Sequence, residues 1–162
     1  MSKVYIYKIV LLGASFVGKT SIAIRSIRNY FHNYQPSTIG ATYLVKKIAR
    51  NNEIIKFEIW DTAGQERYNS LAPLYYRNAD AIIIVFDITR IDSCKSIEYW
   101  MKEIHDKNSC KHDHPILLLG NKSDCESQRL VSHEDIVLLA ARYNMLYFDV
   151  SAKENLNIDM AL

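Results

Sequence analysis

A glycine-rich octapeptide is the feature that most restricts how this chain can fold. Residues 13–20 read G-A-S-F-V-G-K-T, which satisfies the pattern G-x-x-x-x-G-K-[S/T]. The apolar run Tyr5–Leu12 ends directly before the octapeptide, and a helical periodicity over Lys19–Arg28 begins within it. A strand, a glycine-rich loop and a helix in this order are typical of an α/β domain with parallel strands.

Two further apolar runs predict neighbours for this first strand. The segments Ala81–Phe86 and Ile116–Leu119 are short, nearly continuous and rich in Ile, Val and Leu. Strands that are covered on both faces have this composition, so these segments and Tyr5–Leu12 predict the middle of a parallel sheet. Between the first helix and this sheet centre, Tyr43–Arg50 and Ile54–Trp60 predict an antiparallel hairpin at the sheet edge, because they flank an Asn-Asn pair suited to a tight turn.

Helical periodicity recurs in the second half of the chain, at Ser93–Lys107 and His133–Tyr143. Ser132 is the expected N-cap of the second of these helices, with Asp135 in its first turn. The complete order β-α-β-β-α-β-α-β-α-β predicts a three-layer α/β domain with a six-stranded, mostly parallel sheet and one antiparallel edge strand. The length of 162 residues suits a single domain over 1–162.

The composition excludes several other classes of protein. The net charge is +2 and no arginine-rich tract is present, so nucleic-acid binding is not expected. No apolar run approaches the ~20 residues of a membrane-spanning helix. Three cysteines, an odd number without metal-like spacing, indicate free thiols in a reducing compartment. We therefore expect a soluble, intracellular protein.

The octapeptide carries the first piece of chemistry. Its glycines allow the backbone to curl so that successive N–H groups point at phosphate oxygens, and the helix that follows adds its positive end. Lys19 would neutralise β- and γ-phosphate oxygens, and the Thr20 hydroxyl would bind Mg²⁺. An ordinary strand–helix turn could also contain these residues, but the flanking elements favour the phosphate loop. The predicted nucleotide-binding residues here are Gly13, Ser15, Phe16, Val17, Gly18, Lys19, Thr20 and Ser21.

The base is predicted to bind two loops near the end of the chain. Residues 121–124 read N-K-S-D after a predicted strand, and a carboxylate at Asp124 can accept hydrogen bonds from guanine N1–H and its 2-amino group, which adenine cannot offer. Asn121 would tie this loop to the phosphate loop, and the stem of Lys122 would cover the base. Downstream, the tripeptide after the sixth strand would present one N–H to guanine O6. It consists of Ser151, Ala152 (the N–H donor) and Lys153.

A third group of residues predicts hydrolysis and switching. Asp61 could hold a Mg²⁺-bound water, the Gly64 N–H could meet the γ-phosphate, and Gln65 could orient the attacking water. The Thr38 hydroxyl could complete the metal shell only when a γ-phosphate is present, although a lone threonine before a strand is usually a turn residue. The predicted catalytic residues are Gln65, Lys19 and Thr38.

These motifs resemble those of the Ras superfamily and, within it, the Rab family of vesicle-traffic GTPases. The resemblance rests on W-D-T-A-G-Q-E-R-Y at 60–68, I-G-A-T-Y at 39–43, Y-Y-R-N-A-D-A at 75–81 and F-D-I-T at 86–89. The stretches 31–41 and 70–77 resemble the early-endosomal branch most. The resemblance implies a Ras-like P-loop NTPase fold, Mg²⁺ and GTP or GDP as ligands, and a regulator on the cytosolic face of endosomal or other vesicle membranes.

The resemblance also implies partners and the surface that they read. Exchange factors, GTPase-activating proteins, effectors and a GDP-dissociation inhibitor are expected. Phe31 would lie edge-on against guanine, while Ile39, Tyr43, Trp60 and Tyr75 would form the effector surface. An aromatic trio can equally be plain core. The segment Asn29–Asn52 contains basic but no acidic residues, so we expect acidic groups on the effector.

Three departures from the family pattern limit this comparison. Phe16 places a large ring in the phosphate loop, and we expect it to point outward. The sequence supplies no C-terminal cysteines, so membrane attachment is expected only through a C-terminal lipid anchor absent from this chain. The final helix is expected to be truncated in its first turn, which would leave an apolar patch. A nucleotide-binding scaffold that does not hydrolyse GTP and an ATP-dependent enzyme remain as alternatives, the second disfavoured by Asp124.

Overall fold

Six strands form one central sheet in the structure, a computed structural model that describes residues 3–106 and 114–162. The strands are β1 (Lys3–Leu12), β2 (Ala41–Arg50), β3 (Glu53–Thr62), β4 (Ala81–Asp87), β5 (Ile116–Asn121) and β6 (Leu146–Asp149). The helices are α1 (Lys19–Arg28), α2 (Ala72–Tyr76), α3 (Ile91–Asp106), α4 (His133–Arg142) and α5 (Ile158–Ala161), with 3₁₀ turns η1 (Glu66–Leu71) and η2 (Ser123–Gln128).

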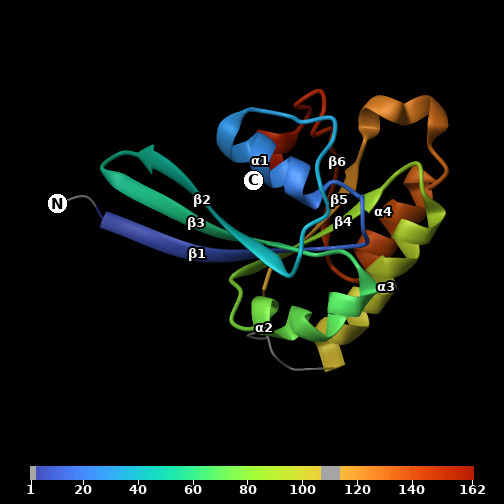
Figure 1. Cartoon of the computed structure of the whole chain (residues 1–162), viewed down its shortest axis with the longest axis horizontal. Helices are drawn as coiled ribbons and strands as arrows, with labels where there is room; N and C mark the ends of the chain where they lie inside the picture. Colours follow the sequence, from blue (N-terminus) through green and yellow to red (C-terminus); the bar gives the residue numbers. More distant parts are fainter. Residues whose placement is uncertain (1–2, 107–113) are drawn as a thin grey trace.

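The strand order is β2-β3-β1-β4-β5-β6, and every pairing is parallel except that of β2 with β3. The predicted central strands β1, β4 and β5 occupy the middle of the sheet, and the hairpin ends at an edge (Figure 1). Asn51 and Asn52 both have positive φ, 50° and 63°, as a tight hairpin turn requires. The predicted six-stranded, mostly parallel α/β architecture is therefore confirmed.

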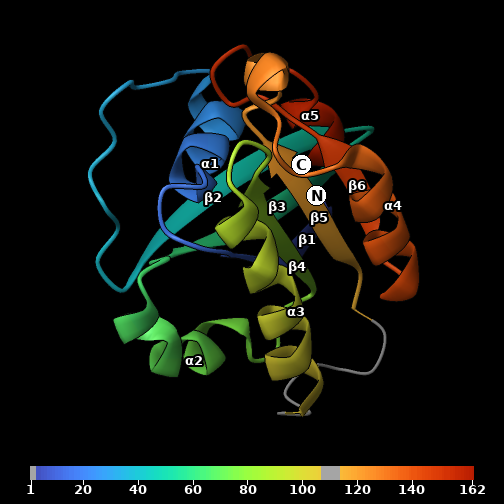
Figure 2. The ribbon, with the colours of Figure 1, turned by 90° about the vertical axis from the view of Figure 1, so that its right-hand side faces the viewer.

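Helices cover both faces of the sheet, so the chain forms three layers (Figure 2). Alternate residues of each central strand enter two separate cores, because side chains of a strand point to opposite faces. Ile9 and Leu11 pack with α1 and α5, whereas Val10 and Leu12 pack with α2, α3 and α4. Both faces of β1 are thus buried at its carboxyl end, which explains its continuous apolar run.

Element boundaries differ from the predicted ones by a few residues. Helix α3 begins two residues before the predicted Ser93, and the predicted end at Lys107 lies outside the described residues. Ser132 caps α4 as predicted, its hydroxyl accepting the Asp135 N–H at 3.4 Å. Between β3 and β4 the chain forms a 3₁₀ turn followed by a single helical turn with proline near its start.

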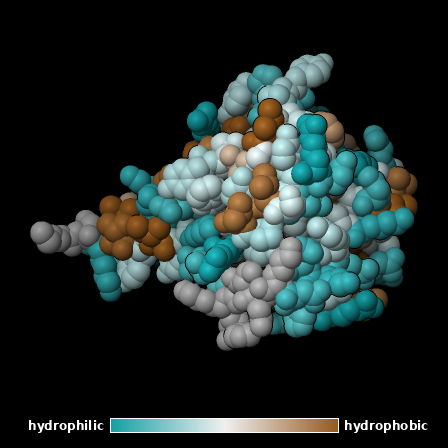
Figure 3. All heavy atoms as spheres, turned by 60° about the horizontal axis from the view of Figure 1, so that its bottom comes forward, coloured by the Kyte–Doolittle hydropathy of each residue, from teal (hydrophilic) through white to brown (hydrophobic). Residues whose placement is uncertain are grey.

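The paired ends of β1, β2 and β3 project beyond the helices (Figure 1). Val4 and Ile6 of β1 are 53% and 56% exposed there. Figure 3 shows apolar side chains gathered at this end of the molecule. Among the described residues, no helix combines the length and apolar character needed to span a bilayer.

Candidate nucleotide-binding site

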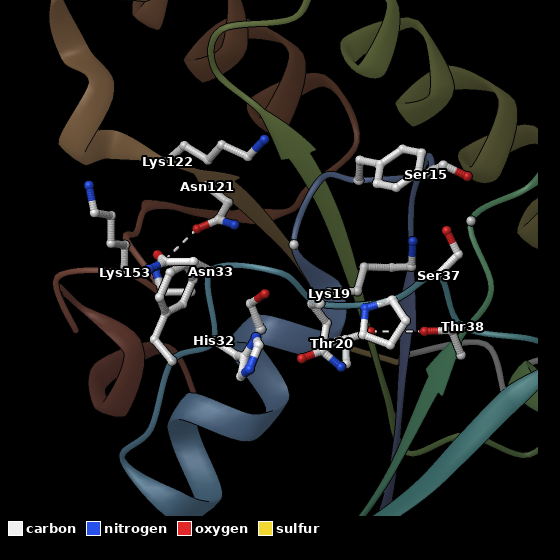
Figure 4. A pocket seen from close by; sticks show the side chains of 18 of the residues that line it. Ser15, Lys19, Thr20, His32, Asn33, Ser37, Thr38, Asn121, Lys122 and Lys153 are labelled. Atoms are coloured by element: carbon white, nitrogen blue, oxygen red, sulfur yellow. Dashed lines mark hydrogen bonds between the residues drawn. The ribbon is translucent and has the colours of Figure 1, made fainter.

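A cavity of about 410 Å³ opens at the carboxyl ends of the parallel strands (Figure 4). Loops that follow different strands meet there because parallel strands end at the same sheet edge. Fifteen residues predicted from the sequence line it: Ser15, Phe16, Gly18, Lys19, Thr20, Ser21, Phe31, Thr38, Gly64, Gln65, Asn121, Lys122, Asp124, Ala152 and Lys153. Gly13, Val17, Asp61 and Ser151 lie outside this lining. Seven lining residues were not predicted: His32, Asn33, Gln35, Pro36, Ser37, Thr62 and Cys125.

Two glycines permit the close packing of the phosphate loop. Gly13 has a φ of 138°, and a Cβ added to it would lie 2.1 Å from the Val85 carbonyl oxygen. Gly18 has a φ of 98°, and its added Cβ would lie 2.2 Å from Nδ2 of Asn121. Both positions combine a left-handed backbone with a lack of space, so the loop cannot accept a side chain at either.

Lys19 is buried beneath this loop, with 5% of its surface exposed. Its Nζ donates hydrogen bonds to the carbonyl oxygens of Gly13 at 2.9 Å and Ala14 at 2.8 Å. Burial lowers the pKa of Lys19 to about 8, and nearby Asp61 partly opposes the shift. The ammonium group therefore lies in a setting where an anionic ligand would stabilise its charge.

A cluster of oxygen atoms lies beside Lys19. The Thr20 hydroxyl donates to Oδ2 of Asp61 at 2.6 Å and lies 2.9 Å from the Thr38 hydroxyl (Figure 4). Oδ1 of Asp61 is buried with no hydrogen-bond partner among the described residues, and burial raises the pKa of this carboxyl group. An orphaned carboxylate oxygen and two hydroxyls fit a hard cation such as Mg²⁺, which keeps several waters and takes oxygen ligands.

The backbone after β3 lies directly against the phosphate loop. A Cβ on Gly64 would lie 2.4 Å from the Ala14 carbonyl oxygen and 2.5 Å from Nζ of Lys19. Gln65 follows in an extended conformation, lines the cavity and precedes η1. The structure thus brings Gly64 and Gln65 to the same end of the cavity as Lys19.

Asn121 joins three loops at the opposite end of the cavity. It is 3% exposed, its Nδ2 donates to the Val17 carbonyl oxygen at 2.8 Å, and its Oδ1 accepts the Ala152 N–H at 3.2 Å. The Ala152 N–H, which we expected to meet guanine, is therefore engaged by Asn121 in this structure. The expected contact with guanine O6 stays a prediction.

The remaining residues of the two base loops are held by side-chain contacts. Oδ1 of Asp124 accepts the Ser151 hydroxyl at 2.6 Å, which joins the two loops and leaves Ser151 itself behind the cavity wall. Nζ of Lys122 lies 2.6 Å from Oδ2 of buried Asp87 at the end of β4. This ion pair fixes the far end of the Lys122 stem, while the residue lines the cavity.

Two arginines that the sequence did not predict hold loops of the site: Arg25 holds the second base loop, and Arg90 holds the phosphate loop. Arg25 of α1 donates to the carbonyl oxygens of Ala152 and Lys153, both at 2.7 Å, and its guanidinium lies 5.9 Å from the centre of the Phe31 ring. Arg90 donates to the Ser15 carbonyl oxygen at 2.9 Å. Arg25 lies at least 127 residues from its acceptors in the sequence, and Arg90 lies 75 residues from Ser15. No local sequence motif can therefore signal these contacts.

The aromatic trio of Tyr43, Trp60 and Tyr75 lies outside the cavity. It is partly core and partly exposed surface, the two alternatives named for it above. The rings of Tyr43 and Trp60 are 5.3 Å apart, and those of Trp60 and Tyr75 are 5.8 Å apart. Trp60 and Tyr75 pack against the core beneath, but Tyr43 is 45% and neighbouring Ile39 is 79% exposed. The trio is therefore anchored in the core and presents its Tyr43 end to solvent.

The fold, the glycine-rich loop and the buried lysine define a P-loop nucleotide-binding domain. A comparison with protein families takes this further. The family model described as Ras family matches residues 8–162. The match spans nearly the whole chain, so the chain belongs to the Ras family of small GTPases. Members of this family generally bind GTP or GDP with Mg²⁺ and hydrolyse GTP.

Proposed function

We propose that this chain is a guanine-nucleotide switch that binds GTP with Mg²⁺, hydrolyses it slowly and shows partners a different surface in each state. The observation that carries the proposal is the position of Thr38. Its hydroxyl lies 2.9 Å from that of Thr20 and 3.4 Å from Oδ2 of Asp61. A residue from the loop between α1 and β2 thus reaches the proposed metal position, so this loop can sense what is bound there.

The proposed hydrolysis is an in-line attack of water on the γ-phosphate. Gln65 and the Thr38 carbonyl hold and orient the water, while Lys19 and the backbone N–H groups of the phosphate loop stabilise charge on the transferring group. Mg²⁺ bound near Thr20, Thr38 and Asp61 would supply further neutralisation of phosphate charge. No arginine occurs in residues 29–37, directly before Thr38. Intrinsic turnover should be slow, and an arginine from an activating protein could add roughly 10³–10⁵-fold.

Loss of the γ-phosphate would release Thr38 and Gly64, and the loops that contain them would relax. The exposed Ile39 and Tyr43 lie just after Thr38, so the surface that we assign to effectors would change with the nucleotide. Together with the Rab-like stretches in the sequence, this arrangement supports a Rab-like regulator of vesicle or endosomal traffic. Exchange factors, activating proteins and a GDP-dissociation inhibitor would be its further partners.

Single-turnover hydrolysis of GTP tests the proposal. Wild-type chain with Mg²⁺ should bind GTP in preference to ATP and hydrolyse it slowly, and Gln65→Leu should bind GTP normally but hydrolyse it at least about tenfold more slowly. Equal slow rates in both proteins would refute the role of Gln65. Binding without any hydrolysis would instead favour a nucleotide-binding scaffold, and preference for ATP would refute the assignment of Asp124.

Membrane localisation in cells tests the traffic assignment separately. The tagged natural protein should collect on vesicle membranes in its GTP-bound form. Thr38→Ala should reduce this membrane localisation. Normal GTP hydrolysis by a protein that never reaches vesicles would contradict the Rab-like role and leave the switch itself intact.

A further inference from the structure

Arg90, directly before α3, reaches back to the phosphate loop. Its Nη1 donates to the Ser15 carbonyl oxygen at 2.9 Å, while Nε and Nη2 donate to the carboxylate of Asp92 at 3.3 Å and 2.5 Å. The guanidinium is planar, so holding one side on Asp92 also fixes the direction of the other side. The bond to Ser15 is therefore made by an oriented donor.

This bond determines where the next N–H group points. The Ser15 carbonyl and the Phe16 N–H belong to one peptide unit, the chain has no cis peptide bond among the described residues, and in a trans peptide these two groups point in opposite directions. Ser15 and Phe16 line the cavity, whereas Arg90 lies outside its lining. A carbonyl held towards Arg90 directs the Phe16 N–H towards the cavity.

Phe16 gives this peptide unit a reason to rotate. Its φ is 63°, in the left-handed region that a residue with a side chain seldom occupies. The residue is 68% exposed, so packing does little to offset the unfavourable backbone. A rotation of the Ser15–Phe16 peptide unit could relieve the strain, but it would turn the N–H out of the cavity.

Three other carbonyls of the loop, those of Gly13, Ala14 and Val17, are held by residues of the recognised motifs. Nζ of Lys19 donates its two hydrogen bonds to the carbonyl oxygens of Gly13 and Ala14, not to that of Ser15. Asn121 holds the carbonyl of Val17. Arg90, which belongs to neither motif, holds the Ser15 carbonyl, which lies between these positions in the loop.

We propose that Arg90 is a positioning residue that holds the Ser15–Phe16 peptide unit against the strain at Phe16, so that the Phe16 N–H binds a phosphate oxygen. The inference rests on the proposed function, because the ligand of this N–H is a guanine nucleotide. It gives Arg90 a role in nucleotide retention without direct contact between its side chain and the nucleotide.

Release of GDP measures this role. In a chase experiment with fluorescent GDP and Mg²⁺, Arg90→Ala should release GDP about tenfold faster than wild type, as expected for loss of a charge-assisted hydrogen bond. Arg90→Lys keeps the positive charge but loses the planar guanidinium that Asp92 orients, so it should release GDP faster than wild type and more slowly than Arg90→Ala. Arg142→Ala removes an arginine of α4 whose ion pair with Glu98 is 3.7 Å long, and it should change nothing. Release from Arg90→Ala within twofold of wild type would overturn the proposal.

A double-mutant cycle with Phe16→Gly tests the coupling to strain. Glycine adopts a left-handed φ without penalty, so Arg90→Ala in this background should accelerate release by only about twofold. The same factor in both backgrounds would refute the link to Phe16.

Melting temperatures with and without GDP separate positioning from folding. If Arg90 were purely structural, Arg90→Ala would lower both melting temperatures equally, whereas the proposed role predicts that it reduces the rise that GDP produces. A wild-type chain that retains no GDP refutes the proposed function and this inference together, but unchanged release from Arg90→Ala of a chain that retains GDP refutes this inference alone.

Discussion

Truncation of Arg25 should weaken GDP binding although this side chain is not part of the cavity wall. Arg25 donates from Nε to the partly buried Ala152 carbonyl and from Nη2 to the exposed Lys153 carbonyl, both at 2.7 Å. We assign about 1.5 kcal/mol to the partly buried bond and about 0.5 kcal/mol to the exposed one, about 2 kcal/mol together. These bonds hold the loop that we propose for the base, so most of their energy should affect the nucleotide complex.

Arg25→Ala should therefore bind GDP about tenfold more weakly, which corresponds to about 1.4 kcal/mol. The remaining ~0.6 kcal/mol should lower the melting temperature of the nucleotide-free protein by about 2 °C. Calorimetric titration with GDP and thermal melting measure the two quantities. Arg28→Ala, which removes an exposed arginine of the same helix, is the matched control. Unchanged GDP affinity with a large loss of melting temperature would refute the reasoning and make Arg25 a purely structural residue.

Three further perturbations follow from the site. Burial lowers the pKa of Lys19 to about 8 from an ordinary 10.5, so between these pH values the unfolded chain binds one more proton than the folded chain. The free energy of unfolding of the nucleotide-free protein should therefore rise with pH in this range. Melting curves should show this rise in wild type and lose it in Lys19→Met. Thr38→Ala should weaken binding of GTP with Mg²⁺ about tenfold and leave GDP binding within about twofold, since the Thr38 contact is conditional, and equal losses in a nucleotide titration would contradict this. Lys47→Glu should weaken binding of an acidic effector, whereas Lys46→Glu should not, because Lys46 faces the opposite side of β2 and pairs with Asp159 at 3.4 Å.

Local sequence patterns predicted the parts of the site that lie on one stretch of chain. The phosphate loop and its lysine are neighbours in sequence, so their spacing alone places the amine beneath the loop carbonyls. Asn121 was predicted to tie its loop to the phosphate loop, and the sheet places β5, the strand that ends at Asn121, one strand away from β1, across β4. In each case the topology was implied by the alternation of strands and helices.

Contacts between distant side chains could not be predicted in this way. Arg25 and Arg90 are ordinary residues in sequence, and their acceptors are backbone carbonyls that no residue type identifies. The pairing of Lys122 with Asp87 also depends on how β4 and β5 align. By contrast, the opposite directions of Lys46 and Lys47 follow from strand alternation, so only Lys47 shares a face of β2 with Tyr43.

Helix α1 connects the two ends of the cavity. Lys19 and Thr20 at its start bind the phosphate loop and the oxygen cluster, and Arg25 near its end binds the loop at 152 and 153. Six residues of α-helix between Lys19 and Arg25 correspond to about 9 Å, a fixed spacing between the groups that we propose for phosphate and for base. We therefore expect helix α1 to couple the proposed phosphate site mechanically to the proposed base site. An exchange factor that displaces α1, or the loop that follows it, would disturb both ends of the nucleotide together and so would not need to compete for either one directly.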